Sequence, residues 1–401
     1  MRWAAATLLL AACSSPEDRP VEWSLDESDF WPSLGTYPGV GEGRIVIPNG
    51  LDDTVSVLDL AAVGSDDLAV IARVPVGLVP VEREGPHHVA TALDGEHYYV
   101  GISNFVPGAG SGPHGVHGGG TASGHILKLR TSDNIEVASV RVDRSPGDVR
   151  LTPDGTKLLV SHFDLLRITE VLQAGGDEAE MVSKLAIIDP VTMTRETLID
   201  LCPAAHGIVI SPDGARAFVS CLDDGLAIVD VASEAHEVTR VTVVPQPGSV
   251  SAPACYPYAL TRSPSGDSVW VSCYSSGQVL RYDVEAGAMD ESLDIRLPGP
   301  AAFGTFAADG TLIVPYQMVN GLAFIDPATG DLDTLDLPAD LCVAPHMARF
   351  TDDDERLLVV CEGDHASPGN LLVMDPETRE VERSVELGIF PDDIGILRSG
   401  G

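Results

Sequence analysis

The sequence predicts an all-β protein, a seven-bladed β-propeller whose blades are four-stranded antiparallel sheets. Three observations lead to this prediction. Forty glycines and 29 prolines among 401 residues indicate many turns between short strands. One strand–turn–strand pattern recurs six times along the chain. The last segment has the pattern of a first strand that its own repeat does not need, so we expect it to complete the first blade.

Each repeat begins with a strand that alternates apolar and polar residues, the period of a half-buried strand. A tight turn follows, usually Asp-Gly, in which glycine readily adopts the positive φ of a two-residue hairpin. The turns fall at residues 94–95, 154–155, 213–214, 265–266, 309–310 and 353–354, the last without glycine. Second, third and fourth strands follow, and the repeat period of 44 to 60 residues is typical of a propeller blade.

Ring closure accounts for the two ends of the repeat array. Residues 44–47 have the pattern of a second strand, so the first blade lacks its innermost strand. Residues 390–397 have the pattern of a spare first strand. Docking this strand into blade one gives seven blades and removes an exposed sheet edge. Residues 165–183 are the best candidate for a helix.

The amino terminus predicts an exported lipoprotein. Residues 4–12 form an apolar run that is too short to span a bilayer but suits a signal peptide. The run ends in Leu-Ala-Ala-Cys, which resembles the lipobox of bacterial lipoproteins, with Cys13 as the lipidated residue. We therefore expect a signal peptide over residues 1–12, a lipidated cysteine and acidic tether over 13–40, and the propeller over 41–401. An ordinary cleaved signal is the alternative. Ser14 favours the outer membrane of a Gram-negative bacterium, by resemblance to known lipoproteins.

Six further cysteines predict three disulfides, which suit an exported chain. The gaps within successive pairs are 19, 18 and 19 residues, and each pair brackets the same hairpin of the repeat. We expect the pairs Cys202 with Cys221, Cys255 with Cys273, and Cys342 with Cys361. The second cysteine of each pair should end a second strand, opposite His206, Tyr258 or His346.

The repeat pattern resembles the YVTN (YncE-like) family of β-propeller repeat proteins. The resemblance covers residues 41–397 and rests on the strand–turn–strand motif, while the Tyr-Val-Thr-Asn of the family is only approximated, as Tyr99-Val100-Gly101-Ile102. The family lies within a broad group that includes lactonase-type and haem-d1-type propellers. The resemblance implies the fold, and a fold does not determine an activity.

The net charge of −36 argues against nucleic-acid binding, because such a surface repels phosphate backbones. It also gives no attraction to anionic lipid, so the expected membrane contact is the lipid anchor. The remaining expected partner is a small molecule, a glycan or an envelope protein.

Candidate site residues come from aligning the repeats on the turn. The residue seven positions before the turn Asp should begin each innermost strand, at one mouth of the central channel. These residues are His87, Gly147, His206, Tyr258, Ala302 and His346, with Asp392 as the equivalent in the closing strand. The long insertions at 105–124, 164–183 and 362–368 should lie over the same face, and the first carries His114 and His117. We expect any ligand to bind there. The opposite face receives the short turns and should leave little room for a pocket.

Two interpretations of this histidine-lined mouth remain open. In one, His87, His206 and His346 bind a transition metal such as zinc or copper, since imidazole is a common ligand for both. In the other, the histidines and Tyr258 cap the channel or bind a ligand through hydrogen bonds. The corresponding functions are a binding module and a metal-assisted hydrolase of the lactonase type, or a redox enzyme. In either case, binding should weaken as pH falls through about 6.5, the ordinary histidine pKa.

Overall fold

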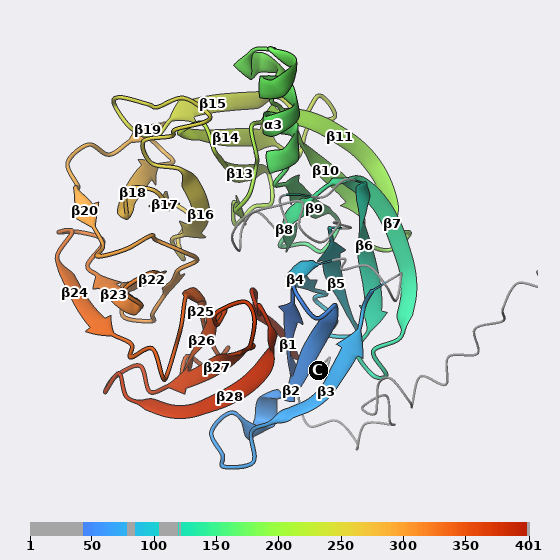
Figure 1. Ribbon diagram of the computed structural model, residues 1–401, viewed down its shortest axis with the longest axis vertical. Coiled ribbons are helices and arrows are strands. Elements are labelled where there is room, and N and C mark those ends of the chain that lie inside the picture. Colours follow the sequence, from blue (N-terminus) through green and yellow to red (C-terminus); the bar gives the residue numbers. More distant parts are fainter. Residues whose placement is uncertain (1–42, 78–84, 104–118, 120–121, 399–401) are drawn as a thin grey trace, which may run out of the picture.

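The structure, a computed structural model, describes residues 43–77, 85–103, 119 and 122–398. These residues form seven antiparallel sheets arranged in a ring, so the predicted fold is confirmed (Figure 1). The predicted signal peptide, Cys13, the tether, His114 and His117 lie outside the described residues.

Each of the first four blades contains four strands, named from the innermost outward. Blade one contains β29 (Gly395–Arg398), β1 (Gly43–Asn49), β2 (Thr54–Asp59) and β3 (Val70–Pro75), with the short helix η1 (Leu60–Ala62) between the last two. Blade two contains β4 (Pro86–Thr91), β5 (His97–Ile102), β6 (Ser123–Arg130) and β7 (Glu136–Arg144). Blade three contains β8 (Pro146–Leu151), β9 (Leu158–His162), β10 (Ser183–Asp189) and β11 (Thr194–Cys202). Blade four contains β12 (Ile208–Ile210), β13 (Arg216–Cys221), β14 (Gly225–Asp230) and β15 (Val238–Thr242).

The remaining three blades follow the same order. Blade five contains β16 (Pro257–Arg262), β17 (Ser268–Cys273) and β18 (Gln278–Asp283), whose outer side pairs with both β19 (Ala288–Met289) and β20 (Ile295–Arg296). Blade six contains β21 (Thr305–Phe306), β22 (Leu312–Tyr316), β23 (Gly321–Ile325) and β24 (Leu332–Asp336). Blade seven contains β25 (Pro345–Phe350), β26 (Leu357–Cys361), β27 (Pro368–Met374) and β28 (Val381–Ile389).

The last strand closes the ring as predicted. Strand β29 pairs antiparallel with β1, with Leu397 opposite Arg44 and Ile396 opposite Ile45. Blade one is therefore built from both ends of the described chain, and β29 covers the inner edge that β1 would otherwise expose.

The hydrophobic core lies between neighbouring blades. Val46 and Val57 of blade one pack in one buried cluster with Val89, Tyr98 and Val100 of blade two. Burial falls from the centre outward, because inner strands such as β9 are wholly buried whereas the outermost β7 is largely exposed or half-buried. The rigid inner strands therefore position whatever side chains stand at their ends.

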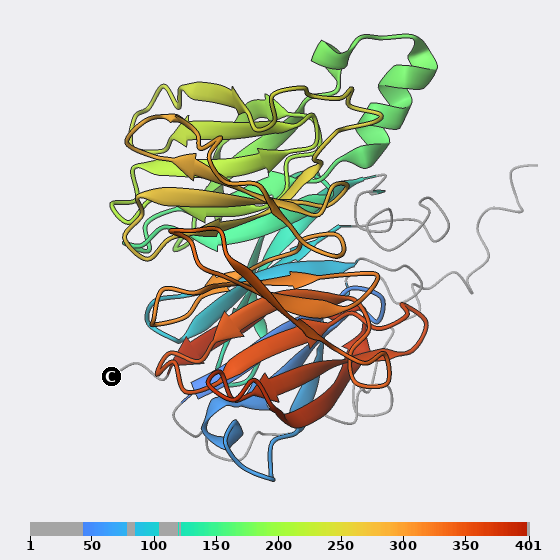
Figure 2. The ribbon, with the colours of Figure 1, turned by 90° about the vertical axis from the view of Figure 1, so that its left-hand side faces the viewer.

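The insertion between β9 and β10 forms the predicted helix. Helix α3 (Leu165–Ala174) is capped at its start by Asp164, whose side chain accepts from the backbone N–H of Arg167, and is followed by the short helix η2 (Glu178–Glu180). Figure 2 shows α3 projecting from one face of the ring.

The three predicted disulfides are confirmed: Cys202–Cys221, Cys255–Cys273 and Cys342–Cys361. The second cysteine of each pair ends β13, β17 or β26. The predicted strand partners were off by one residue in two blades, since Cys273 pairs with Pro257 and Cys361 with Pro345. The reason is a shift of register at the start of these innermost strands, which the alignment of repeats could not show.

Candidate metal and ligand site

The structure brings five predicted site residues into one buried, closed cycle of contacts. His87 Nδ1 is hydrogen-bonded to Asp392 Oδ2, and His87 Nε2 lies 3.3 Å from His206 Nε2. His206 Nδ1 lies 3.3 Å from the backbone oxygen of Tyr258, and the two rings stack with centroids 4.2 Å apart. The Tyr258 hydroxyl contacts His346 Nε2 at 3.1 Å, and His346 Nδ1 donates to the backbone oxygen of Asp392 at 2.9 Å. The alignment on the repeat turn therefore identified neighbours in space.

A second layer of polar residues, which the sequence reasoning missed, lies one residue further along the same strands. His88 Nδ1 contacts Asp393 Oδ2 at 2.9 Å, and that carboxylate also accepts from the Val89 N–H at 3.1 Å. Arg150 links Asp393 to Asp148, with nitrogen–oxygen distances of 3.1 Å to each. In the alignment of the repeats on their turns, one shared position is occupied by His88, Asp148 and Asp393. This position comes directly after the one that was used to select the predicted site residues, so inspecting it as well would have found all three.

An irregularity in the strands explains why two successive residues both face the centre. In a regular strand His87 and His88 would point to opposite faces. The pairing of β4 with β5 shifts register between Pro86 and Val89, a β-bulge that redirects the side chains next to it. Both imidazoles are at most 1% exposed and lie with ring centroids 4.3 Å apart.

The two neighbouring aspartates have opposite electrostatic character. Burial, with Glu362 and Asp393 nearby, raises the pKa of Asp392 well above its ordinary value. Burial would also raise the pKa of Asp393, but the positive charge of Arg150 and the hydrogen bond from His88 outweigh it and lower that pKa. Asp393 is therefore a carboxylate, and His88 donates to it through Nδ1–H.

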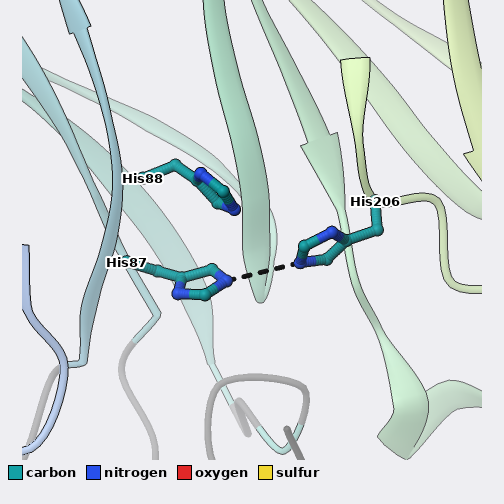
Figure 3. Close-up of side chains that lie close together, drawn as sticks. All are labelled: His87, His88 and His206. Atoms are coloured by element: carbon teal, nitrogen blue, oxygen red, sulfur yellow. Dashed lines mark hydrogen bonds between the residues drawn. The ribbon is translucent and has the colours of Figure 1, made fainter. Parts of the chain in front are cut away.

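Three imidazoles converge so that each can present a nitrogen lone pair to a shared point. Because Nδ1 of His88 carries the proton, its Nε2 carries a lone pair, and this buried atom has no hydrogen-bond partner among the described residues. Ligand nitrogens of His87, His88 and His206 lie within 4.8 Å of one another (Figure 3). Two nitrogens bound to a tetrahedral zinc ion at its usual distance would be about 3.3–3.4 Å apart. The 3.3 Å between His87 Nε2 and His206 Nε2 fits this value.

His346 belongs to a different group of potential ligands. It clusters with Glu362 and Asp392, again within 4.8 Å, and its Nε2 lies 3.8 Å from Glu362 Oε1. Glu362 also accepts from Gln317 Nε2 and contacts His365 Nε2, both at 2.7 Å. Burial lowers the pKa of His346, so its ring is neutral near pH 7. Of the three histidines predicted as one metal set, His87 and His206 thus lie together with His88, and His346 joins the acidic group.

The face that receives the Asp-Gly turns is not closed, contrary to the expectation from sequence. A cavity of about 420 Å³ opens among the far ends of the innermost strands, with Arg150, Phe303 and Arg349 on its wall.

Comparisons with known proteins support the fold. No protein-family model matches this chain, and no curated protein sequence does. Among solved structures, the periplasmic gluconolactonase of Pseudomonas aeruginosa is 19% identical, with 90% of this chain and 100% of that chain covered and a TM-score of 0.64. The hydrazine synthase of Kuenenia stuttgartiensis is 16% identical, with 81% and 94% covered and a TM-score of 0.58. A protein of unknown function from Desulfotomaculum acetoxidans is 12% identical, with 89% and 99% covered and a TM-score of 0.63.

These similarities define the class as β-propellers, a fold shared by proteins with unrelated activities. Function must therefore be argued from the site. Among the described residues, no helix is long and apolar enough to cross a membrane.

Proposed function

We propose that this protein is an exported propeller that holds a transition metal, of the zinc or copper class, on His87, His88 and His206. The observation that carries the proposal is the buried Nε2 of His88, which has no hydrogen-bond partner among the described residues and lies beside two other imidazole nitrogens. A buried polar atom without a partner costs about 1–3 kcal/mol, and a bound cation would remove that cost.

The surrounding residues suit this role because each imidazole is held through its other nitrogen. Asp392 contacts His87, Asp393 contacts His88, and the backbone oxygen of Tyr258 contacts His206. Such outer partners fix the orientation and tautomer of metal-binding histidines. A metal with three histidine ligands polarises carbonyl groups and activates bound water. The neutral His346 ring and the Tyr258 hydroxyl stand next to the three histidines, where they could hold or pass on a proton.

Hydrolysis of a lactone-type ester is the second candidate function, and it depends on the first. It is favoured by the Tyr258–His346 hydrogen bond beside the proposed metal ligands, and the gluconolactonase with the same fold agrees with it. If the site carries no metal, the remaining candidate is a binding module that recognises a small molecule, a glycan or a protein at this mouth.

The deciding experiment is metal analysis of tag-free protein after dialysis against a weak chelator. We expect close to one zinc or copper ion per chain, lost in His88→Asn and His206→Asn. His236→Asn is the matched control, because His236 lies outside the centre of the ring and its Nδ1 contacts the backbone oxygen of Asp230 rather than another imidazole. A folded, metal-free wild type that takes up neither ion would overturn the proposal. Turnover of glucono-δ-lactone that requires the metal supports hydrolysis, and metal without turnover refutes only that second function.

We further propose that the chain is anchored to the envelope through a lipid on Cys13 and is a divergent YVTN-type propeller. Three disulfides suit an oxidising compartment, and Leu-Ala-Ala-Cys precedes the proposed anchor. Cys13→Ala should move the protein from the membrane fraction to the soluble fraction. A variant that stays in the membrane fraction would contradict the anchor.

A further inference from the structure

The cavity on the turn face is lined by arginines in a chain that is otherwise strongly acidic. Arg150, Arg262 and Arg349 all contribute to its wall, although the protein has a net charge of −36. These arginines come from β8, β16 and β25, three different blades that surround the centre of the ring. The cavity measures about 420 Å³, within the usual range for small-molecule sites.

The positive charge of this cavity is only partly compensated. Arg150 is paired with Asp148 and Asp393. Arg349 donates through one terminal nitrogen to the backbone oxygen of Ile394 at 2.7 Å, and Arg262 contacts the backbone oxygens of Ser263 and Pro264. Among the described residues, no carboxylate lies within ion-pair distance of Arg262 or Arg349. Of the three arginines, Arg150 alone has carboxylates at ion-pair distance, and one of these, Asp393, also contacts His88. Asp352, whose charge also acts on Arg349, is paired with Arg398.

Arg349 shows the effect of this imbalance. Burial lowers the pKa of its guanidinium, and neighbouring Arg150 lowers it further, while the negative charges of Asp393 and Asp352 compensate only in part. An arginine remains charged in spite of such shifts, so the cost falls on the folded state. An anion in the cavity would offset that cost.

The rest of the wall is apolar and aromatic. Phe303 and Phe306 of blade six, Met347 of blade seven and Ile210 of blade four line the same space. Thr261, whose hydroxyl is buried without a hydrogen-bond partner among the described residues, also lies on this wall. A bare inorganic ion would leave this apolar surface unused, whereas an anion attached to an apolar body would cover it.

We propose that the turn-face cavity binds an organic carboxylate, with its charged end toward Arg262 and Arg349 and its apolar body against Phe303 and Phe306. This site is separate from the proposed metal ligands and would exist even if the protein bound no metal. The two sites are nevertheless connected. Arg150 pairs with the same Asp393 that accepts from His88. The Phe303 ring also lies against the rings of His88 and His206, with centroids 5.1 and 5.7 Å apart.

The test uses isothermal titration of the metal-free full chain with benzoate, benzamide and inorganic phosphate as probes. We expect saturable binding of benzoate, and no binding of the uncharged benzamide. Arg262→Gln and Arg349→Gln should each weaken benzoate binding about tenfold or more, since a hydrogen bond to a charged group contributes about 1.5–3 kcal/mol. Arg240→Gln is the control, because Arg240 is a surface residue paired with Asp223, and it should change binding less than about twofold.

Three results with the wild-type protein would overturn the proposal. They are no saturable benzoate binding, equal binding of benzamide, or phosphate binding as tight as benzoate, which would indicate a simple oxyanion site. Arg349 supports the backbone at Ile394, so its variant could fail to fold. Arg262→Gln then decides the question alone, because the Arg262 guanidinium donates to backbone oxygens of the adjacent turn and does not support another strand. Unchanged benzoate affinity in folded Arg262→Gln would place the anion elsewhere.

Discussion

Asp393 accepts a hydrogen bond from His88 Nδ1 at 2.9 Å, although 305 residues separate the two in the chain. Both are fully buried, and the same carboxylate receives Arg150 and the Val89 N–H. One side chain from the closing segment therefore orients an imidazole of blade two and neutralises an arginine of blade three.

Asp393→Asn should lower the free energy of unfolding by about 3–5 kcal/mol, because it removes one partner of a buried charged pair. It should also weaken metal binding by about 10–100-fold, the usual effect of losing an outer partner of a ligand. Urea unfolding of metal-free protein and metal titration measure the two effects. Asp333→Asn is the control, since Asp333 pairs with Arg379 at the surface, where solvent screens the pair, and it should leave stability almost unchanged. Similar losses in both variants would contradict the role of Asp393.

Asp392→Asn should impair metal binding through the tautomer of His87. An asparagine can donate its amide N–H to His87 Nδ1, which places the ring proton on Nε2 and blocks the proposed ligand atom. Metal titration of the variant measures the loss of affinity.

Metal binding to the wild-type protein should release a proton. Burial raises the pKa of Asp392, so the Asp392–His87 pair retains a proton that a metal must expel. Titrations in buffers of different ionisation enthalpy should detect this release. Release unchanged in Asp392→Asn would exclude Asp392 as its source.

Replacing Cys202 and Cys221 together with alanine should lower the free energy of unfolding by about 3 kcal/mol in the chain-entropy model of disulfides. The pair closes a segment with a sequence separation of 19 between the end of β11 and the end of β13. Peptide mapping under non-reducing conditions should show this pair together with Cys255–Cys273 and Cys342–Cys361. Free thiols or exchanged pairs in the mature protein would refute the assignment.

His162 should make the fold sensitive to acid. Its Nδ1 donates to the backbone oxygen of Lys184 and its Nε2 accepts from the Asp143 N–H, and burial lowers its pKa to about 4. Because the folded pKa is below the unfolded value of about 6.5, its stabilising contribution is present above pH 6.5 and is lost as pH falls toward 4. The loss amounts to about 3 kcal/mol at 1.36 kcal/mol per pKa unit. His162→Gln should be less stable at pH 7 and show a flatter decline, as measured by urea unfolding at pH 7, 5.5 and 4.

Asp164 lines a surface pocket together with His162, and its effect on stability should have the opposite pH dependence. Burial raises its pKa to about 6, so its favourable contribution exists at low pH and is lost as pH rises through 6. Asp164→Asn keeps an amide oxygen that can cap α3 and removes the titration. The difference in stability between wild type and this variant should therefore change between pH 4 and pH 7 in the direction opposite to that for His162→Gln. A difference of the same sign for both would refute these assignments.

Much of the fold follows from local patterns that the sequence repeats. Asp-Gly turns and their variants mark the first hairpins of blades two to seven. The surplus strand at the C-terminus predicts closure through β29, because a propeller with an open edge is unfavourable. The cysteine spacing predicts the disulfides for the same reason, since equal gaps across equal hairpins give equal geometry.

The site was only half predictable, because side-chain direction depends on strand irregularities. Regular alternation places His88 and Asp393 on the face opposite His87 and Asp392, so the alignment selected only one column of residues. The bulge that brings His88 inward has no signal of its own in a single sequence. Glu362 was missed because it lies in a loop after β26, outside the repeated pattern.

Because β29 closes the ring, the centre of the propeller can be completed only late in synthesis and folding. Asp392 and Asp393 leave the ribosome after blades two to seven have been made, whereas His87 and His88 belong to the first of those blades. The proposed metal ligands therefore acquire their supporting carboxylates only once the closing segment has been synthesised and the ring has shut. A chain that ended before residue 392 would lose the closing strand and also both aspartates. It would keep all three histidines, without the carboxylates that orient His87 and His88. A truncated propeller of this kind could not assemble the centre of the ring.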